Sequence, residues 1–569
     1  MKVSYEKEGR DMTYVHRETL SASPRLKPHP IPRTMTRFQA EEESMNLTAI
    51  LDRAARLFPD NPAVRRGSEP CDYRQLGKRV ARLAGSLKDL GLSPGDRVAA
   101  LLRNVQSFLE IYFAAPAAGL VLVPVNHRLS SDEVGAIFED ADVSAVVAEP
   151  RFAETVDGAL QDGARPCRVW ATEEGDDAPP GETLEALLGG SSTIPPERWG
   201  AAGRDDPAQI YYTSGTTGEP KGVVLTHGNV SFHALMAAAE LSLSEQDVWL
   251  HAAPLFHLAD AWATFALTWV GGSHVMAPDF DEEAVLDLFE SEGITLTNLI
   301  PTMLNRLVNH PGAPSRDFSA LRVMLSGGAP ISPQLVRRIM DTFGCDYLQT
   351  YGLTETSPYL TLSKLKASLE SLPDEEKFWY KACTGRPMLG VEVRVVDENG
   401  RDVPADRKTV GEIVARGESV TPGYRGKEEE TRRAFRDGWF HTGDLAVLDR
   451  EGYVNIVDRK KDVIMSGGEQ VFSIEVENAL EEHADVLEVA VIAVPDETWG
   501  EAIKAVVVRR EGAGVTAEEL ISFCRSKLAR YKAPKSVDFL AALPKTGSRK
   551  INKRVLREPY WEGMERRVH

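Results

Sequence analysis

Residues 211–222 read Tyr-Tyr-Thr-Ser-Gly-Thr-Thr-Gly-Glu-Pro-Lys-Gly. Hydroxyl side chains, glycines and one lysine stand here between two short strand-like stretches, residues 209–212 and 222–226. Glycine lets the backbone approach a bulky ligand closely, and hydroxyl and ammonium groups bind phosphate oxygens. The sequence therefore predicts a strand-loop-strand unit that binds a polyphosphate, and we call residues 213–221 the phosphate loop. The candidate binding residues are Thr213, Ser214, Gly215, Thr216, Thr217, Gly218 and Lys221.

The phosphate loop does not follow the P-loop pattern. In that pattern a lysine is followed by serine or threonine at the start of a helix. Here Pro220 precedes Lys221 and Gly222 follows it, and a helical pattern begins only near Asn229. Composition alone also allows a polar, flexible linker, but the further motifs described below argue against a linker.

Charge and cysteine content exclude several classes of protein. The chain has 569 residues and a formal net charge of −19, which argues against a nucleic-acid partner because such a partner requires a basic face. The five cysteines include no Cys-x-x-Cys pair, so neither a zinc site nor a disulfide framework is indicated. A reducing, cytoplasmic location is expected, and the sequence is compatible with a homodimer.

The N-terminal and the most apolar segments give no sign of membrane insertion. Residues 1–45 are polar, contain several prolines and lack the apolar core of a secretory signal, so they read as a flexible arm. The longest apolar stretch, residues 108–125, contains Glu110 and Pro116. It predicts a buried helix followed by a strand and no integral membrane segment.

The hydrophobic pattern divides the rest of the chain into three parts. Up to about residue 390, helical patterns alternate with apolar strands, which predicts an α/β fold with layered, largely parallel sheets. In residues 390–460, apolar and polar residues alternate with period two, which predicts a β-rich lobe. Residues 461–569 are expected to form a small α+β unit. We therefore expect an N-terminal domain over residues 46–460, which includes the lobe, and a C-terminal domain over residues 461–569.

A second glycine-rich turn, residues 326–330, also follows an expected strand, and such turns line ligand sites at strand ends in open α/β sheets. Gly328 and Ala329 of this turn are expected to lie at a nucleotide.

Four further motifs follow in the chain. They are Gln-Thr-Tyr-Gly-Leu-Thr-Glu-Thr at 349–356, Gly-Trp-Phe-His-Thr-Gly-Asp at 438–444, Asp-Arg-Lys-Lys-Asp at 458–462 with Ser-Gly-Gly-Glu at 466–469, and Pro-Lys-Thr-Gly-Ser-Arg-Lys-Ile-Asn-Lys at 544–553.

The motif at 349–356 contains residue types that suit a nucleotide. The Tyr351 ring can stack on adenine, and Gly352 is expected to leave room beside it. Thr354 offers a hydroxyl group to a phosphate, and Glu355 is a hard oxygen ligand for Mg²⁺ that bridges ATP phosphates. A helix cap would also explain the Thr-Glu pair, but not its occurrence together with the phosphate loop.

Two charged residues in the later motifs suit the sugar of the nucleotide. Asp444 can accept hydrogen bonds from both ribose hydroxyls, and Arg459 can donate to the same sugar. The alternative for Asp444 is a turn aspartate that follows Gly443.

Together, these stretches resemble the adenylate-forming superfamily, in its acyl-CoA synthetase and fatty-acid–CoA ligase branch. The resemblance extends from about Asn46 to Leu556. It implies that a carboxylate attacks the α-phosphorus of MgATP to give acyl-AMP and pyrophosphate, and that coenzyme A then forms the thioester and releases AMP. The implied substrate is a medium- or long-chain fatty acid. The alternatives are a short, sulfur-containing or aromatic acid, an enzyme that loads a carrier protein, or a non-catalytic nucleotide-binding module.

The resemblance also implies roles for the C-terminal unit. Lys550 would stabilise the charge that develops at the α-phosphorus, with Glu355 and Thr213 as further catalytic residues. The family pattern has glycine before this lysine, whereas this chain has Arg549. The small domain would swing at Lys461 between the two steps. Gly467 and Gly468 would then leave space for the pantetheine arm of coenzyme A.

For the acyl group, the resemblance implies a pocket formed by four residues from separate segments. A buried structural histidine and a core tryptophan are the alternatives for two of them. The expected pocket residues are His257, Trp262, Gly327 and Pro358.

We expect Lys550→Ala to slow adenylate formation by about 10²–10³-fold, the usual effect of removing one preorganised donor. The second half-reaction should be spared, because this charge is needed in one domain position only. Pyrophosphate release and thioester yield from supplied acyl adenylate measure the two steps. If the variant forms adenylate at the wild-type rate, the role passes to Lys545 or Lys553, for which the sequence predicts surface positions.

Overall fold

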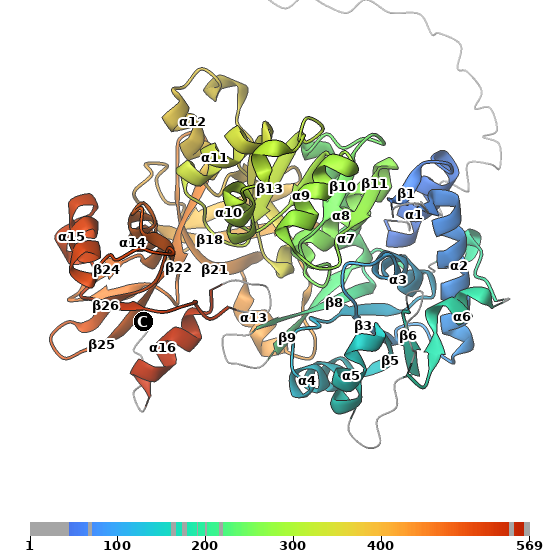
Figure 1. Cartoon of the computed structure of the whole chain (residues 1–569). Coiled ribbons are helices and arrows are strands. Elements are labelled where there is room, and N and C mark those ends of the chain that lie inside the picture. Colours follow the sequence, from blue (N-terminus) through green and yellow to red (C-terminus); the bar gives the residue numbers. More distant parts are fainter. Residues whose placement is uncertain are drawn as a thin grey trace, which may run out of the picture. The chain divides into compact units, whose positions relative to one another are not determined.

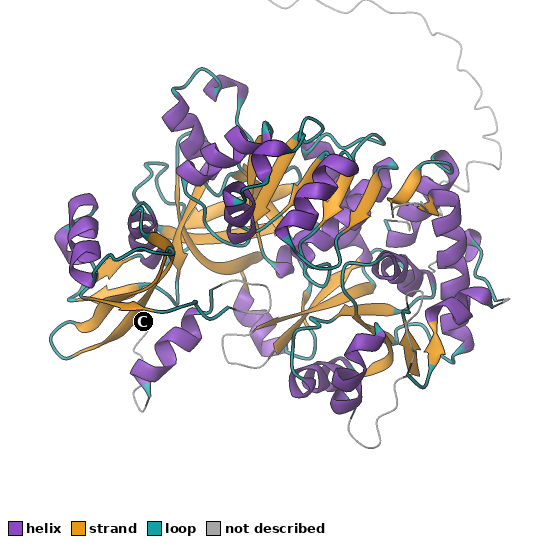
Figure 2. Ribbon diagram, in the orientation of Figure 1, coloured by secondary structure: helices purple, strands orange, loops and turns teal. Residues whose placement is uncertain are grey.

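A computed structural model shows a mixed α/β protein, as the sequence predicts (Figures 1 and 2). The expected N-terminal arm lies outside the described residues, except for Met45, so it stays a prediction. Among the described residues, no helix is long and apolar enough to cross a membrane. The structure describes residues 45–65, 71–160, 167–172, 179–190, 192–199, 202–214, 220–545 and 551–562.

The first sheet has a parallel centre and antiparallel strands at its edges. Its inner strands alternate between two apolar faces: Val248 and Leu250 face α9, α10 and α11, whereas Trp249 faces α7 and α8 (Figure 1). In order across the sheet, the strands are β16 (Arg386–Pro387), β15 (Tyr359–Leu362), β14 (Asp346–Gly352), β13 (Val323–Gly327), β12 (Leu296–Asn298), β10 (Val248–His251), β11 (Ser273–Met276), β1 (Pro62–Arg65) and β2 (Cys71–Asp72). The helices are α7 (His227–Glu240), α8 (Leu258–Val270), α9 (Glu282–Ser291), α10 (Pro301–Asn309), α11 (Pro333–Phe343) and α12 (Asp374–Ala382).

The second sheet repeats this layering with helices on both faces. The apolar stretch at 108–125 forms α3 and β4, which confirms the expected helix and strand. The strands, in order, are β19 (Gly423–Tyr424), β9 (Pro220–Thr226), β8 (Pro207–Ser214), β4 (Val121–Pro124), β3 (Arg97–Leu101), β5 (Val143–Ala148), β6 (Cys167–Trp170) and β7 (Glu182–Thr183). The helices are α1 (Leu47–Leu57), α2 (Tyr73–Asp89), α3 (Gln106–Ala117), α4 (Ser131–Ala141), α5 (Ala153–Ala159), α6 (Leu184–Gly189) and α13 (Glu428–Ala434).

Two smaller sheets follow, and both are mainly antiparallel. The third sheet corresponds to the β-rich lobe and contains β17 (Val391–Val396), β18 (Gly411–Gly417), β21 (Trp439–Leu448), β20 (Phe435–Arg436) and β22 (Val454–Arg459). The fourth contains β24 (Glu469–Val471), β23 (Ile464–Ser466), β26 (Gly500–Arg509), β25 (Val486–Asp496) and β27 (Ser536–Phe539). Its helices, orange to red in Figure 1, are α14 (Ser473–Glu481), α15 (Ala517–Lys527) and α16 (Lys553–Trp561).

A buried polar chain anchors α8 to the first sheet. His251 Nδ1 lies 2.8 Å from an oxygen of Asp260, and His251 Nε2 lies 2.9 Å from His274 Nδ1. His274 Nε2 in turn lies 3.1 Å from the Thr268 hydroxyl oxygen. Asp260 and Thr268 belong to the first and last turns of α8, whereas the two histidines belong to β10 and β11. Because buried ionisable groups are costly without partners, this chain fixes the helix on the sheet.

Lys553 is not a surface residue, so that prediction was wrong. Its ammonium group lies 2.7 Å from Glu477 and donates to the Ser473 hydroxyl at 2.7 Å, and its side chain is only 17% exposed. Burial by itself lowers the pKa of Lys553, but the carboxylates of Glu477 and Asp458 outweigh this effect and raise the pKa. Lys545 pairs with Glu488 at 2.6 Å in a more exposed position.

We expect Lys553→Ala to destabilise the fold around α14 by about 3 kcal/mol, because it leaves the buried Glu477 carboxylate without its partner. The matched control, Lys545→Ala, should cost no more than about 1 kcal/mol, as for other exposed pairs. Hydrogen–deuterium exchange of α14 and β25 measures both effects. Equal exchange in the two variants would contradict the assignment of Lys553 to a buried ion pair.

Candidate active site

The strands that flank the phosphate loop form the expected antiparallel hairpin. Thr213 on β8 pairs with Lys221 on β9, and Ser214 pairs with Pro220. The prediction of a strand-loop-strand unit is confirmed for these flanks. The candidate residues Gly215, Thr216, Thr217 and Gly218 lie outside the described residues, as does the side chain of Ser214.

A tyrosine that the sequence analysis did not identify connects the phosphate loop to the 349–356 motif. The Lys221 ammonium lies 5.4 Å from the centroid of the Tyr424 ring, and the Tyr424 hydroxyl donates to Glu355 at 2.9 Å. Tyr424 belongs to β19, which pairs with β9 directly beside Lys221. Its short strand has no periodic pattern, so only the three-dimensional pairing brings it to the site.

Tyr351, Asp444 and Arg459 meet as the sequence predicts for one nucleotide site. The Tyr351 hydroxyl, at the end of β14, donates to Asp444 at 2.8 Å. Arg459 Nε lies 3.3 Å from the other Asp444 oxygen, because the two residues are register partners on β21 and β22. The Asp444 side chain is only 6% exposed, whereas that of Arg459 is 51% exposed. Burial and the Asp444 carboxylate raise the pKa of Tyr351 well above its usual range, so its hydroxyl remains a donor.

The glycines beside this cluster are required by packing of the chain itself. A side chain on Gly352 would place its Cβ 1.8 Å from the carbonyl oxygen of Pro358. The expectation that Gly352 leaves room for adenine is therefore corrected: that room is filled by the neighbouring backbone. A Cβ on Gly327 would lie 2.2 Å from the Thr350 hydroxyl, and Gly328 has a φ of +81°. Ala329 is fixed through its carbonyl, which accepts from Gln349 at 2.9 Å.

Thr354 and Glu355 open a 3₁₀ helix, residues Thr354–Thr356, directly after β14. The backbone carbonyl of Glu355 accepts from Thr421 at 2.8 Å. The Thr-Glu pair is therefore the start of the helix itself and not its cap, because the N-cap residue is Leu353. Glu355 is also held next to β19 by the Tyr424 hydroxyl.

Two of the expected acyl-pocket residues, His257 and Trp262, belong to the N-cap and first half of α8, and Pro358 directly precedes β15. Trp262, on α8, is 1% exposed and forms edge-to-face contacts with Tyr359 and His233 at centroid distances of 5.2 and 5.8 Å. His257 precedes α8 and is half-buried, with its ring 4.6 Å from that of Phe256. Pro358 is buried next to Tyr359. His233 was not identified from the sequence.

Of the residues predicted to act in the C-terminal unit, the structure describes Lys461, Gly467 and Gly468 but not Lys550. Lys461 occupies an exposed turn after β22, and Lys550 lies outside the described residues. A Cβ on Gly467 would lie 2.5 Å from the Trp499 ring, so the space at this glycine is taken by tryptophan. At Gly468, by contrast, no described atom lies within 4 Å of the position of an added Cβ. The expectation of open space is therefore corrected for Gly467 and retained for Gly468.

The chain matches known proteins over most of its length. Residues 51–425 match the pattern described as AMP-binding enzyme, and residues 475–550 match the AMP-binding enzyme C-terminal domain. The chain belongs to the AMP-binding enzyme family. This confirms the predicted adenylate-forming superfamily and the predicted enzyme class, an AMP-forming acid–thiol ligase.

Individual relatives of this AMP-binding enzyme differ in their named acids. A feruloyl-CoA synthase of Amycolatopsis is 41% identical over 89% of this chain and 98% of its own length. A long-chain-fatty-acid–CoA ligase of Thermus thermophilus is 39% identical over 91% of this chain and 96% of its own length. The crystal structure of ATP-bound MatB from Rhodopseudomonas palustris is similar with a TM-score of 0.80 and 31% identity, and covers 91% of this chain and 100% of that structure.

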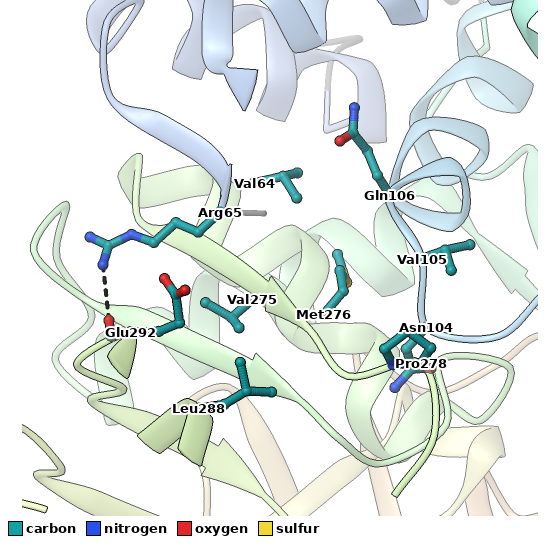
Figure 3. Close-up of a pocket in the computed structure, with 10 residues that line it drawn as sticks. All are labelled: Val64, Arg65, Asn104, Val105, Gln106, Val275, Met276, Pro278, Leu288 and Glu292. Atoms are coloured by element: carbon teal, nitrogen blue, oxygen red, sulfur yellow. Dashed lines mark hydrogen bonds between the residues drawn. The ribbon is translucent and has the colours of Figure 1, made fainter. Parts of the chain in front are cut away.

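One small cavity lies apart from the residues described so far. It has a volume of about 160 Å³ and lies between β1, β11, the end of α9 and the loop before α3 (Figure 3). Arg65 donates across its rim to the carbonyl of Glu292 at 2.9 Å, and Asn104 is satisfied by bonds to the carbonyls of His251 and Ala253. None of the predicted site residues lines this cavity.

The prediction that Glu355 binds Mg²⁺ can be compared with its surroundings in this AMP-binding enzyme. Among the described residues, no cluster of three or more His, Cys, Asp or Glu side chains could hold a metal on its own. Mg²⁺ commonly uses only one or two protein carboxylates together with substrate phosphates, so a single glutamate fits. Burial raises the pKa of Glu355, although the Tyr424 hydroxyl that donates to it opposes the shift.

The raised pKa predicts how magnesium dependence changes with pH. The Glu355 carboxylate gains a proton at a higher pH than an ordinary glutamate, and a protonated carboxyl binds Mg²⁺ poorly. We expect the Mg²⁺ concentration needed for half-maximal pyrophosphate release to rise as the pH falls through this raised pKa.

Glu355→Gln should require more Mg²⁺ at every pH and should lose this dependence on pH. Glu355→Asp, which keeps the charge, is the control. The same Mg²⁺ dependence in the wild type and the glutamine variant would exclude Glu355 as a ligand.

Proposed function

We propose that this chain activates a carboxylic acid with ATP and transfers the acyl group to coenzyme A. The acid's carboxylate attacks the α-phosphorus, pyrophosphate leaves, and an acyl-AMP mixed anhydride forms. The sulfur of coenzyme A then attacks the acyl carbonyl, its proton passes to solvent, and AMP leaves. The observation that carries this proposal is the Tyr351–Asp444–Arg459 cluster beside the linked Lys221, Tyr424 and Glu355.

We assign the nucleoside of ATP to the Tyr351–Asp444–Arg459 cluster. Tyr351 would stack on adenine beside Gly328 and Ala329, and Asp444 would accept hydrogen bonds from the ribose hydroxyls. Arg459 is largely exposed and can donate to the same sugar while it keeps its contact with Asp444. Because Tyr351 already donates to one Asp444 oxygen, the carboxylate is held in a single orientation before the sugar arrives.

We assign the phosphates and Mg²⁺ to the linked residues Lys221, Tyr424 and Glu355. The phosphate loop, with Thr213 and Lys221, would bind the phosphates together with Thr354. Tyr424 holds one oxygen of Glu355, so we assign the other oxygen to Mg²⁺. When bound, the metal would neutralise charge on the phosphate oxygens. The Lys221 ammonium above the Tyr424 ring is placed by a cation–π contact, which limits how far this charge moves without substrate.

The C-terminal domain would supply the remaining parts. We propose that it comprises residues 461–569, turns at Lys461, brings Lys550 to the α-phosphate and later presents Gly468 to the pantetheine arm. Rotation of this kind concentrates in a few residues at element ends, and Lys461 occupies such a turn. A cytoplasmic location and a homodimer stay predictions.

For the acid, we favour an aromatic body over a fatty acyl chain. Trp262, Tyr359 and His233 form one buried group of rings, and rings suit edge-to-face contacts with an aryl group. The similarity to a feruloyl-CoA synthase supports the same choice, whereas the similarity to a long-chain-fatty-acid–CoA ligase supports the predicted fatty acid.

A panel of arylalkanoic and fatty acids, each with ATP, Mg²⁺ and coenzyme A, tests the proposal. We expect pyrophosphate release that depends on the acid and a thioester that depends on coenzyme A, with the highest kcat/KM for an aryl acid. Replacing coenzyme A by a holo-carrier protein should abolish thioester formation. Thioester formation only with the carrier protein would favour the carrier-loading alternative, and no acid-dependent pyrophosphate release would favour a non-catalytic module.

A further inference from the structure

A set of buried side chains meets at the carboxyl ends of the parallel strands of the first sheet. The carbonyl of Ala259 accepts from the Trp262 indole at 3.0 Å, from the Tyr359 hydroxyl at 3.0 Å and from the Asn298 amide at 2.7 Å. Asn298 is the last residue of β12, and Tyr359 opens β15. Ligands of open α/β sheets bind outside these strand ends, so this polar group lies at the expected edge.

His233 joins this group from α7, and its hydrogen bond fixes its tautomer. The backbone N–H of Tyr359 donates to His233 Nε2 at 3.1 Å. Burial lowers the pKa of His233 to about 3, so the ring is neutral near physiological pH. A neutral imidazole carries one hydrogen, and because Nε2 accepts, that hydrogen lies on Nδ1. His233 therefore offers one N–H donor of known position.

That donor has no acceptor among the described residues. The His233 side chain is fully buried, and Nδ1 is without a hydrogen-bond partner in the described part of the chain. The Oδ1 atom of the buried Asn298 is likewise without one. Buried polar groups are satisfied in the great majority of cases, and leaving one unpaired is costly. Two such atoms in side chains that both bond to the Tyr359–Ala259 group indicate a place for an external polar group.

We propose that His233 is a specificity-determining residue whose Nδ1–H donates to an oxygen on the body of the acid, away from its carboxylate. This inference rests on the proposed function, and it narrows the substrate class to acids whose acyl group carries an ether, hydroxyl or carbonyl oxygen. Such an oxygen satisfies the donor, whereas a hydrocarbon acid would bury it unpaired.

A purely structural role leaves the choice of histidine unexplained. Edge-to-face packing against Trp262 and Tyr359 needs only a ring, and the bond from the Tyr359 backbone needs only an acceptor. Phenylalanine supplies the first and glutamine the second. The donor at Nδ1 is the property that histidine adds to both.

The test compares pairs of acids that differ only by an oxygen atom. Para- and meta-methoxyphenylpropanoic acids are paired with their ethylphenyl analogues, and oxa-fatty acids are paired with fatty acids of equal length. For each pair, the ratio of kcat/KM for the oxygen-bearing acid to that for the hydrocarbon acid is measured by pyrophosphate release. In the wild type we expect this ratio to reach about tenfold in at least one pair, the size of one hydrogen bond.

Two variants separate the donor from the structural bond. His233→Gln can still accept from the Tyr359 backbone but has no donor at the Nδ1 position, so the ratio should fall to about one. His233→Asn places an amide N–H near the Nδ1 position and should keep a preference for oxygen, even if it is less stable. Thermal unfolding of both variants shows whether a fall in activity reflects loss of fold.

Each outcome decides the proposal. A ratio near one for all pairs in the wild type overturns it. A glutamine variant that keeps the wild-type ratio also overturns it, because the preference for oxygen would then not depend on the Nδ1 donor. If no acid supports pyrophosphate release, the proposed function fails and this inference fails with it. If hydrocarbon and oxygen-bearing acids react equally well, only this inference fails.

Discussion

Residues 349–356 are tied to two other sheets by hydrogen bonds, and the candidate site depends on this constraint. Tyr351, at the end of β14 in the first sheet, donates to Asp444 in the third sheet. Glu355, one turn later, accepts from Tyr424 in the second sheet. Because Tyr351 and Glu355 belong to one short segment that is bonded to two sheets, a movement of one of these side chains would also disturb the other. These bonds restrain the separation of the groups that we assign to the sugar and to the metal, and in our proposal the phosphate chain would lie between them.

The two glycines of this region show how the same constraint acts on the backbone. Gly352 packs against the carbonyl of Pro358 and Gly327 against the side chain of Thr350, so β13, β14 and the segment before β15 approach closely. The polar chain from Asp260 to His274 fixes α8, the helix that carries Trp262, on the first sheet. The expected acyl-pocket residues thus lie on or next to elements that are fixed by packing and hydrogen bonds. In contrast, the expected hinge lies in an exposed turn, as a moving part requires.

The sequence alone was sufficient for the fold class, the phosphate-loop hairpin and the meeting of Tyr351 with Asp444 and Arg459, because each has a local pattern or a motif. It was not sufficient where the chain folds back on itself. Tyr424 reaches Glu355 only through the pairing of β19 with β9, and the ion pair of Lys553 depends on α16 packing near α14. The role of a glycine is also invisible in one sequence, because the atoms that fill its space come from distant residues.

Transfer of oxygen from the acid to AMP tests the central claim most directly. The acid is supplied with both carboxylate oxygens replaced by the heavy isotope, together with ATP, Mg²⁺ and coenzyme A, and the AMP and pyrophosphate are analysed by mass spectrometry. Attack of the carboxylate on the α-phosphorus predicts one heavy oxygen in AMP and none in pyrophosphate. Unlabelled AMP, or release of ADP and phosphate in place of AMP and pyrophosphate, would contradict an acyl-adenylate intermediate.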